Sequence, residues 1–203
     1  MKIEIRNDKV EIDGYVNAVE RKSKPIKSRL GDFVERIKKG AFERAIERND
    51  NIRILLNHDW NKDLGGTADG NLELTEDNIG LRARATITDP DVVEKAKNGD
   101  LVGWSFGFSD RPDGVGMHDE DGMTVRDVKD LDLYEVSLLD RTRTPAYEGT
   151  LVTVRADELH YHGEALIQDI EVREITEPTS ETTEDKPIDY SKWENIISEM
   201  KGE

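Results

Sequence analysis

The sequence predicts an α+β fold in which an antiparallel β-barrel or sandwich carries a few helices on its outside. About eight or nine short apolar or alternating segments follow one another in the first ~155 residues, and only two segments there place apolar residues at helical spacing. Strands that succeed one another without intervening helices are typical of antiparallel sheets, because parallel strands need long crossover connections.

Four strands and one helix are expected in the first part of the chain. The strands lie, in order, at Lys2–Arg6, Val10–Val16, Phe33–Ile37 and Ile52–Leu56. The first alternates apolar and charged residues, as a strand with one buried face does, and the last is a compact apolar run. A helix is expected over residues 41–46, where apolar residues follow Gly40 at helical spacing, and a loop rich in turn-forming residues over 61–70.

The second part begins with a predicted hairpin, in which Leu72–Leu74 and Leu81–Ile87 flank a turn at Asp77–Gly80. Asp89-Pro90 has the character of an N-cap followed by a first helical residue, so a short helix is expected from there to Gly99. Further strands are expected at Leu101–Phe108, Thr124–Lys129, Leu131–Leu139 and Leu151–Val154, with a Gly/Asp-rich loop at residues 110–122.

The charge is distributed unevenly and divides the chain into two parts. The net charge is −16, and Asp157–Glu203 alone contains 14 acidic and 4 basic residues. We therefore expect one folded domain over residues 1–156 and an acidic, flexible tail over residues 157–203. Within this tail, Glu177–Pro187 has the composition of a linker, and the apolar residues around Trp193 predict a terminal helix.

Composition and motifs exclude several classes of function. The chain has no Cys, so disulfides and a catalytic cysteine are excluded. No apolar run approaches the roughly 20 residues of a membrane helix, and the N-terminus lacks the apolar centre of a signal peptide, so we expect a soluble, cytoplasmic protein. The acidic surface argues against nucleic-acid binding.

His160 and His162 share one face of a strand but have no third ligand, and no HExxH-like motif occurs, so we expect no metal and no cofactor.

Ser105 is the first candidate for chemistry. It lies in an apolar strand between Gly103 and Gly107. A buried hydroxyl needs a partner, and the glycines allow backbone or substrate to approach closely. The alternative is a serine that is hydrogen-bonded within the sheet. The pattern Gly-x-Ser-x-Gly also marks the nucleophile elbow of α/β-hydrolases, but that elbow needs a following helix, whereas Phe108 is followed by a loop.

His58 is the candidate base. It follows the apolar strand Ile52–Leu56, and a strand end that opens into a loop is a good position for a catalytic histidine. The alternative is a histidine satisfied by its neighbour Asp59.

Glu135 is the candidate acid. In a regular strand, alternation predicts one face formed by Leu131, Leu133, Glu135 and Ser137. A carboxylate that continues a row of leucines toward a core needs a partner, and a histidine side chain would supply one. The alternative is an edge-strand glutamate in solvent.

Four stretches in this order carry a resemblance to a known family. They are Gly31–Phe42, Leu55–Thr67 with Leu-Leu-Asn-His-Asp at its start, Gly99–Phe108 with Gly-Trp-Ser-Phe-Gly, and Leu133–Tyr147 with Tyr-Glu-Val-Ser. Together they resemble the prohead (capsid-maturation) proteases of tailed bacteriophages, which are distant relatives, by fold, of the herpesvirus assemblins. The likeness spans residues ~10–155, and four ordered motifs are more specific than any one of them.

The resemblance implies a catalytic triad of Ser105 as nucleophile, His58 as base and Glu135 as the acid that orients it, on an antiparallel β-barrel with peripheral helices. It also implies that the stretch with Arg141 and Arg143 contributes to the oxyanion hole; the alternative is that both are surface charges. Trp104 stands where family members often have a smaller residue such as Met, and we expect it only to reshape a neighbouring pocket.

The resemblance further implies a serine peptidase inside the assembling procapsid, in the cytoplasm of the host. Its expected substrates are the major capsid protein, the scaffold protein or both, and it is expected to cleave itself, with loss of the acidic tail. The assemblins dimerise, which leaves an oligomer open for this chain. Two alternatives remain: an inactive capsid-assembly or scaffold protein that keeps the protease fold, and an unrelated antiparallel β binding module.

Overall fold

The computed structural model describes residues 1–28, 31–142, 153–155, 158–162 and 171–174. Strands dominate these residues, accompanied by helices α1 (Ala41–Arg48) and α2 (Pro90–Lys97). The strands are β1 (Lys2–Arg6), β2 (Lys9–Ala18), β3 (Phe33–Ile37), β4 (Arg53–Leu56), β5 (Asp59–Gly66), β6 (Leu72–Glu76), β7 (Gly80–Ile87), β8 (Leu101–Asp110), β9 (Val115–Glu120), β10 (Met123–Val128), β11 (Leu131–Asp140), β12 (Thr153–Arg155), β13 (Glu158–His162) and β14 (Glu171–Glu174).

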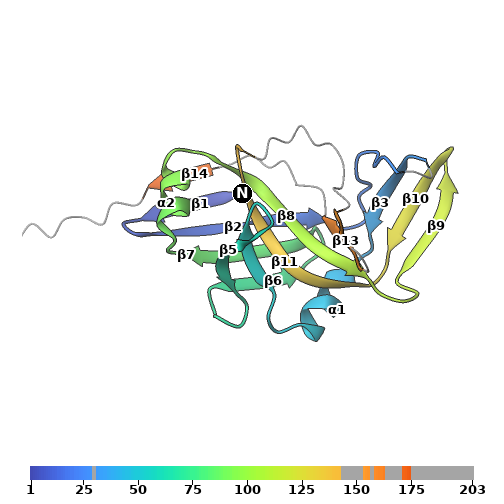
Figure 1. Ribbon diagram of the computed structural model, residues 1–203, viewed down its shortest axis with the longest axis horizontal. Coiled ribbons are helices and arrows are strands. Elements are labelled where there is room, and N and C mark those ends of the chain that lie inside the picture. Colours follow the sequence, from blue (N-terminus) through green and yellow to red (C-terminus); the bar gives the residue numbers. More distant parts are fainter. Residues whose placement is uncertain (29–30, 143–152, 156–157, 163–170, 175–203) are drawn as a thin grey trace, which may run out of the picture.

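These strands form three open sheets in the part of the chain that is described. The orders are β14-β1-β2-β7-β6, β3-β10-β9 and β12-β13-β8-β11-β4-β5. The two long strands β8 and β11 cross the middle of the molecule, and the β3-β10-β9 sheet stands at one end (Figure 1). The predicted α+β class is thus confirmed in broad terms. The predicted closed barrel is not, because the outer strands of each described sheet do not pair with each other.

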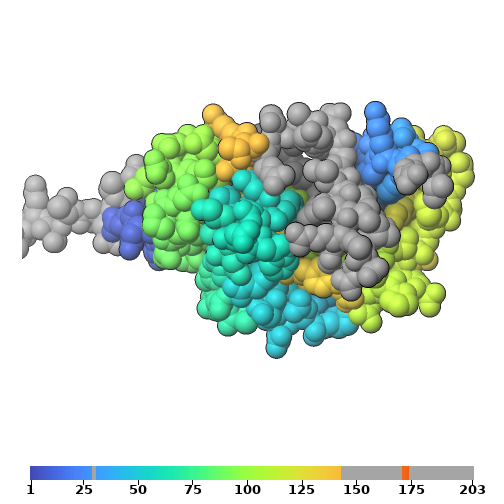
Figure 2. Space-filling view, in the orientation of Figure 1, coloured from blue at the N-terminus to red at the C-terminus, as the bar shows by residue number. Residues whose placement is uncertain are grey.

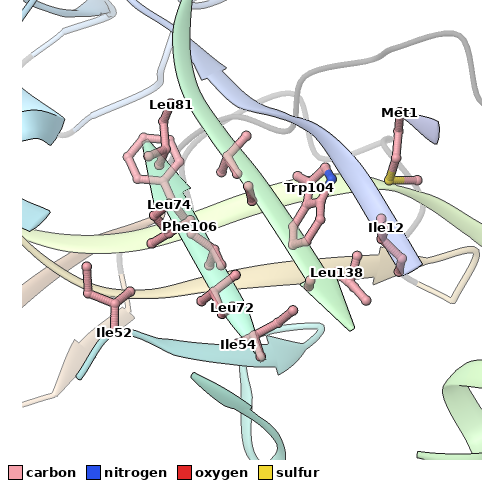
Figure 3. Packing of buried hydrophobic residues seen from close by; sticks show 14 of the residues in the cluster. Met1, Ile12, Ile52, Ile54, Leu72, Leu74, Leu81, Trp104, Phe106 and Leu138 are labelled. Carbon is pink, nitrogen blue, oxygen red and sulfur yellow. The ribbon is translucent and has the colours of Figure 1, made fainter. Parts of the chain in front are cut away.

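The core lies between the two larger sheets. Residues of β2 alternate between buried and partly exposed along the strand, as expected for a strand with one face on a core. Trp104, Phe106 and Leu138 from β8 and β11 pack among Ile12 and Leu72 from the other large sheet (Figure 3). Trp104 is fully buried in this cluster, so its indole is part of the core.

The two helices follow their sequence signals. Asp89 caps α2, because its side chain accepts a hydrogen bond of 3.1 Å from Val92 N, and Pro90 begins the helix. Gly40 precedes α1 with a φ of 83°, a left-handed conformation that favours glycine. Phe42 of α1 packs edge-to-face on Phe106 of β8, with 5.2 Å between the ring centroids, and α1 also contacts β11 and β6.

Several strands occur where none was predicted. β5 occupies residues expected to be a loop, and β9 lies within the Gly/Asp-rich segment 110–122. Both are outer strands of their sheets and are rich in polar residues, which is how proteins protect exposed sheet edges and which makes such strands resemble loops in composition.

Part of the predicted tail also belongs to the sheets. β13 pairs with β8, and β14 pairs in parallel with β1. The linker at Glu177–Pro187, the helix around Trp193 and the side chains of His160 and His162 lie outside the described residues.

Candidate active site

β8 and β11 pair in an antiparallel manner along almost their whole length, and they carry Ser105 and Glu135 of the candidate site. In this register Ser105 lies opposite Ser137, and Gly107 lies opposite Glu135. Directly paired residues in an antiparallel sheet project to the same face, with Cα atoms about 4.5–5.5 Å apart. The pairing therefore places Ser105, Gly107, Glu135 and Ser137 on one face of the sheet.

A β-bulge at Tyr134 decides which face this is. Leu133 pairs with Phe108, and Glu135 pairs with the very next residue of β8, Gly107. One extra residue on β11 shifts the alternation of its side chains by one step. The residues of β11 that reach the core are therefore Leu131, Leu133, Val136 and Leu138. The prediction that Glu135 shares a face with the leucines before it is wrong, because that prediction assumed an uninterrupted strand.

His58 is the second residue of a tight turn between β4 and β5. Leu56 pairs with Asp59, so the loop consists of Asn57 and His58, with φ angles of 58° and 59°. Two consecutive left-handed residues are the mark of a type I′ hairpin. Asn and His adopt this conformation more readily than most other residues with a side chain, but it still costs free energy, and residues held in it cluster at functional sites. The β5 hairpin, in teal, lies on the outside of the molecule in Figure 2.

Hydrogen bonds to the end of β11 hold this turn in place. β4 runs parallel to β11, so the turn after β4 lies beside the last residues of β11. Asn57 N donates to Leu138 O over 2.8 Å, and Asn57 Oδ1 accepts from Asp140 N over 3.0 Å. His58 N donates to Ser137 Oγ over 3.1 Å. The main chain of His58 is thereby fixed to the strand that carries Glu135.

The side chains of His58 and Glu135 form a hydrogen bond. Nδ1 of His58 lies 2.8 Å from Oε1 of Glu135. Glu135 is only 2 % exposed. The other carboxylate oxygen, Oε2, accepts a 2.5 Å hydrogen bond from Ser137 Oγ. A proton on Nδ1 leaves Nε2 as the hydrogen-bond acceptor of a neutral imidazole. Glu135 thus supplies a carboxylate that bonds Nδ1, and Asp59 accepts hydrogen bonds from Asn61 through Oδ1.

Gly107 makes room for this pair. A Cβ atom built on residue 107 would lie 2.3 Å from Glu135 Oε1, closer than van der Waals contact permits. The second glycine of Gly-x-Ser-x-Gly therefore has a local structural reason. It lets the carboxylate lie over the backbone of β8, beside Ser105, which is itself 3 % exposed.

The predicted oxyanion region lies just beyond β11. Arg141 N donates to Asp100 O over 3.0 Å, and Nε of Arg141 lies 3.6 Å from Asp100 Oδ1, with 67 % of the side chain exposed. Arg143 lies outside the described residues.

Asp140, at the end of β11, contacts the turn that carries His58. Its carboxylate is buried, contacts Lys95 of α2 and accepts hydrogen bonds from Thr142. Burial alone would raise the pKa of Asp140, but hydrogen bonds from Thr142 and Asn57, together with Lys95, outweigh it and lower the pKa to about 2.

Sequence reasoning did not assign roles to Asn57, Ser137 or Asp140. A signal for Asn57 was present, because Asn is favoured at left-handed hairpin positions. No local signal marks Ser137, since its role depends on residues nearly eighty positions away in sequence.

The described residues contain no cluster of three or more His, Asp or Glu side chains able to hold a metal ion. No helix among them has the length and apolar character needed to cross a membrane.

A histidine whose Nδ1 bonds a buried carboxylate is one part of the arrangement that serine peptidases use. The model of a protein family described as "Caudovirus prohead serine protease" matches residues 1–164, and the chain belongs to this family. The family implies a serine peptidase that acts in capsid maturation. No curated protein and no solved structure was found to match the chain.

Proposed function

We propose that this protein is a serine endopeptidase in which Ser105 is the nucleophile, His58 the general base and Glu135 the residue that orients the base. The observation that carries the proposal is the hydrogen bond between His58 Nδ1 and the buried carboxylate of Glu135. Family membership supports the class of reaction, and the register that places Ser105 beside Glu135 and Ser137 supports the choice of nucleophile.

In the proposed mechanism, Glu135 holds the proton on Nδ1, so the lone pair of Nε2 is available to Ser105. Nε2 takes the proton from Oγ as Oγ attacks the carbonyl carbon of the scissile peptide bond. Glu135 stabilises the imidazolium that results. Because the Glu135 carboxylate is buried, water screens its charge only weakly. The imidazolium then protonates the leaving amine, the C–N bond breaks, and water hydrolyses the acyl-enzyme through the same base.

Ser105 and Ser137 lie opposite each other on the paired strands β8 and β11, and the hydrogen bonds of Ser137 are not those of a nucleophile. Ser137 donates its hydroxyl proton to Glu135, and its oxygen accepts the N–H of His58. A nucleophile must instead donate its proton to the histidine ring. These contacts favour Ser105 as the nucleophile.

We assign stabilisation of the oxyanion to the stretch that contains Arg141 and Arg143. The N–H of Arg141 donates to Asp100 O, and the guanidinium, although it lies near the Asp100 carboxylate, belongs to a side chain that is 67 % exposed, so we propose the guanidinium as the group that reaches a substrate. We propose as substrates the scaffold protein or the scaffold segment of the major capsid protein, inside the procapsid in the host cytoplasm, and in addition this chain itself, with removal of its acidic tail.

The test is co-expression of the protein with the capsid protein that is encoded next to it, followed by intact-mass measurement of both chains. The wild type is compared with Ser105→Ala and with Ser109→Ala, a matched serine of β8 whose hydroxyl bonds Tyr134. We expect cleavage in the wild type and in Ser109→Ala, and none in Ser105→Ala. Cleavage that persists in Ser105→Ala would remove Ser105 as the nucleophile. Absence of cleavage in all three would favour an inactive assembly protein with the protease fold.

A further inference from the structure

Ser137 contacts both functional parts of the proposed catalytic pair. Its Oγ donates to Oε2 of Glu135 over 2.5 Å and accepts from the backbone N of His58 over 3.1 Å. The residue is completely buried. A single hydroxyl therefore connects the main chain of the base to the side chain of the acid.

We propose that Ser137 is a positioning residue of the peptidase, which sets the orientation of the Glu135 carboxylate and of the His58 turn together. The inference rests on the proposed function and deepens it by adding a residue to the site. Ser137 does not face the substrate, and it acts through Glu135 and His58 only.

The physical reason lies in the two oxygens of Glu135. Oε1 bonds Nδ1 of His58, and a buried carboxylate needs its second oxygen satisfied as well. The Ser137 hydroxyl supplies that bond and restrains rotation of the carboxylate, so that Oε1 continues to face the imidazole. Because a hydroxyl has one proton to donate and lone pairs to accept, the same group is able to receive the His58 N–H at the same time.

The second contact fixes the turn. His58 has a left-handed backbone with φ 59°. This conformation costs free energy, and it persists only where surrounding contacts offset that cost. The bond from His58 N to Ser137 Oγ is such a contact, and it lies one residue from the bond between Asn57 N and Leu138 O. Loss of the hydroxyl would release both the carboxylate and the backbone of the base.

The experiment compares Ser137→Ala and Ser137→Thr with the wild type and with Ser109→Ala. Cleavage rates are measured against concentration of the capsid or scaffold substrate. We expect Ser137→Ala to lower kcat on the order of 10- to 100-fold, the loss expected for one hydrogen bond to a charged group, with KM unchanged. Ser137→Thr, which keeps the hydroxyl, recovers part of kcat, and Ser109→Ala stays near the wild type.

A second measurement separates this proposal from the proposed function. In the Ser105→Ala background, NMR follows the Nδ1 proton of His58 and the hydrogen exchange of its backbone amide. Ser137→Ala should weaken the Nδ1–H signal and speed exchange of the His58 amide at least about tenfold, without speeding exchange in the core of β8. If only the peptidase assignment fails, these NMR changes persist without any cleavage activity. Wild-type kcat together with an unchanged His58 amide in Ser137→Ala would overturn the positioning role.

Discussion

Gly107 and Glu135 face each other across β8 and β11 so closely that a Cβ on residue 107 would lie 2.3 Å from Glu135 Oε1. The atom that would be displaced is the one that bonds the imidazole of His58. The backbone of the serine-bearing strand is thus shaped to accept the carboxylate.

Substitution Gly107→Ala is therefore expected to displace Glu135 from His58. We expect a loss of about 1–3 kcal/mol in the free energy of unfolding from overpacking, and a fall in kcat of at least about tenfold. Urea denaturation and cleavage assays measure the two effects. Gly116→Ala in β9 is the matched control, because the nearest atom to its Cβ would be 3.7 Å away. Equal behaviour of the two variants would contradict the role of Gly107.

The contribution of the Glu135 charge to cleavage can be tested separately from the contribution of its side-chain shape. Glu135→Gln keeps the size of the side chain but removes the negative charge that stabilises a protonated His58. We expect kcat to fall by about 10²- to 10⁴-fold, with the fold retained. Cleavage time courses read by intact mass measure this loss, and Glu43→Gln on the exposed surface of α1 serves as the control. Undiminished cleavage by Glu135→Gln would remove Glu135 from the catalytic machinery.

Asp140 predicts a dependence of stability on acid pH. Its pKa is about 2 in the folded protein against an ordinary 3.8, so the unfolded chain binds this proton more readily than the folded one. The carboxylate therefore contributes stability that is fully present above about pH 4 and is lost as the pH falls toward 2. The contribution corresponds to about 2 kcal/mol.

The measurement is urea unfolding of wild type and Asp140→Asn at several pH values between 7 and 2.5. We expect Asp140→Asn to be less stable at neutral pH, and the difference between the two proteins to shrink as the pH falls below 4. Asp8→Asn, in the exposed turn between β1 and β2, should show a constant small difference. A gap for Asp140→Asn that does not change with pH would contradict the assigned pKa.

Asn57 combines a left-handed backbone with a side-chain hydrogen bond, and two variants separate them. Asn57→Gly keeps the conformation but leaves Asp140 N without its acceptor, which should cost about 1–3 kcal/mol. Asn57→Ala should cost about 1–2 kcal/mol more, because alanine is strained at φ 58°.

Urea denaturation measures these costs, and cleavage assays should show reduced activity for both variants. Asn7→Ala provides the comparison, since Asn7 has φ 47° in a turn of the other large sheet. It should lose stability by strain alone and keep full activity. Full activity in Asn57→Ala would mean that the turn does not position His58.

The class of the fold and the identity of the candidate residues followed from the amino-acid sequence alone. Period-two alternation in β2 and the Asp-Pro start of α2 depend on neighbours along the chain, so local reasoning located them correctly. Pattern and resemblance also selected His58, Ser105 and Glu135 from a chain with 45 acidic residues and 4 histidines.

The relative positions of these residues depend on how the strands pair in three dimensions. The bulge at Tyr134 exists because β11 pairs with β8 in one particular register, and it moves Glu135 from the expected leucine face to the face of Ser105. The parallel pairing of β4 with β11 brings His58 to Glu135 across 77 residues of sequence. Strand order, register and bulges are set by the partner strand, which alternation within a single segment does not specify. The open sheets and the hydrogen bonds of Ser137 to His58 and Glu135 therefore became visible only in the folded chain.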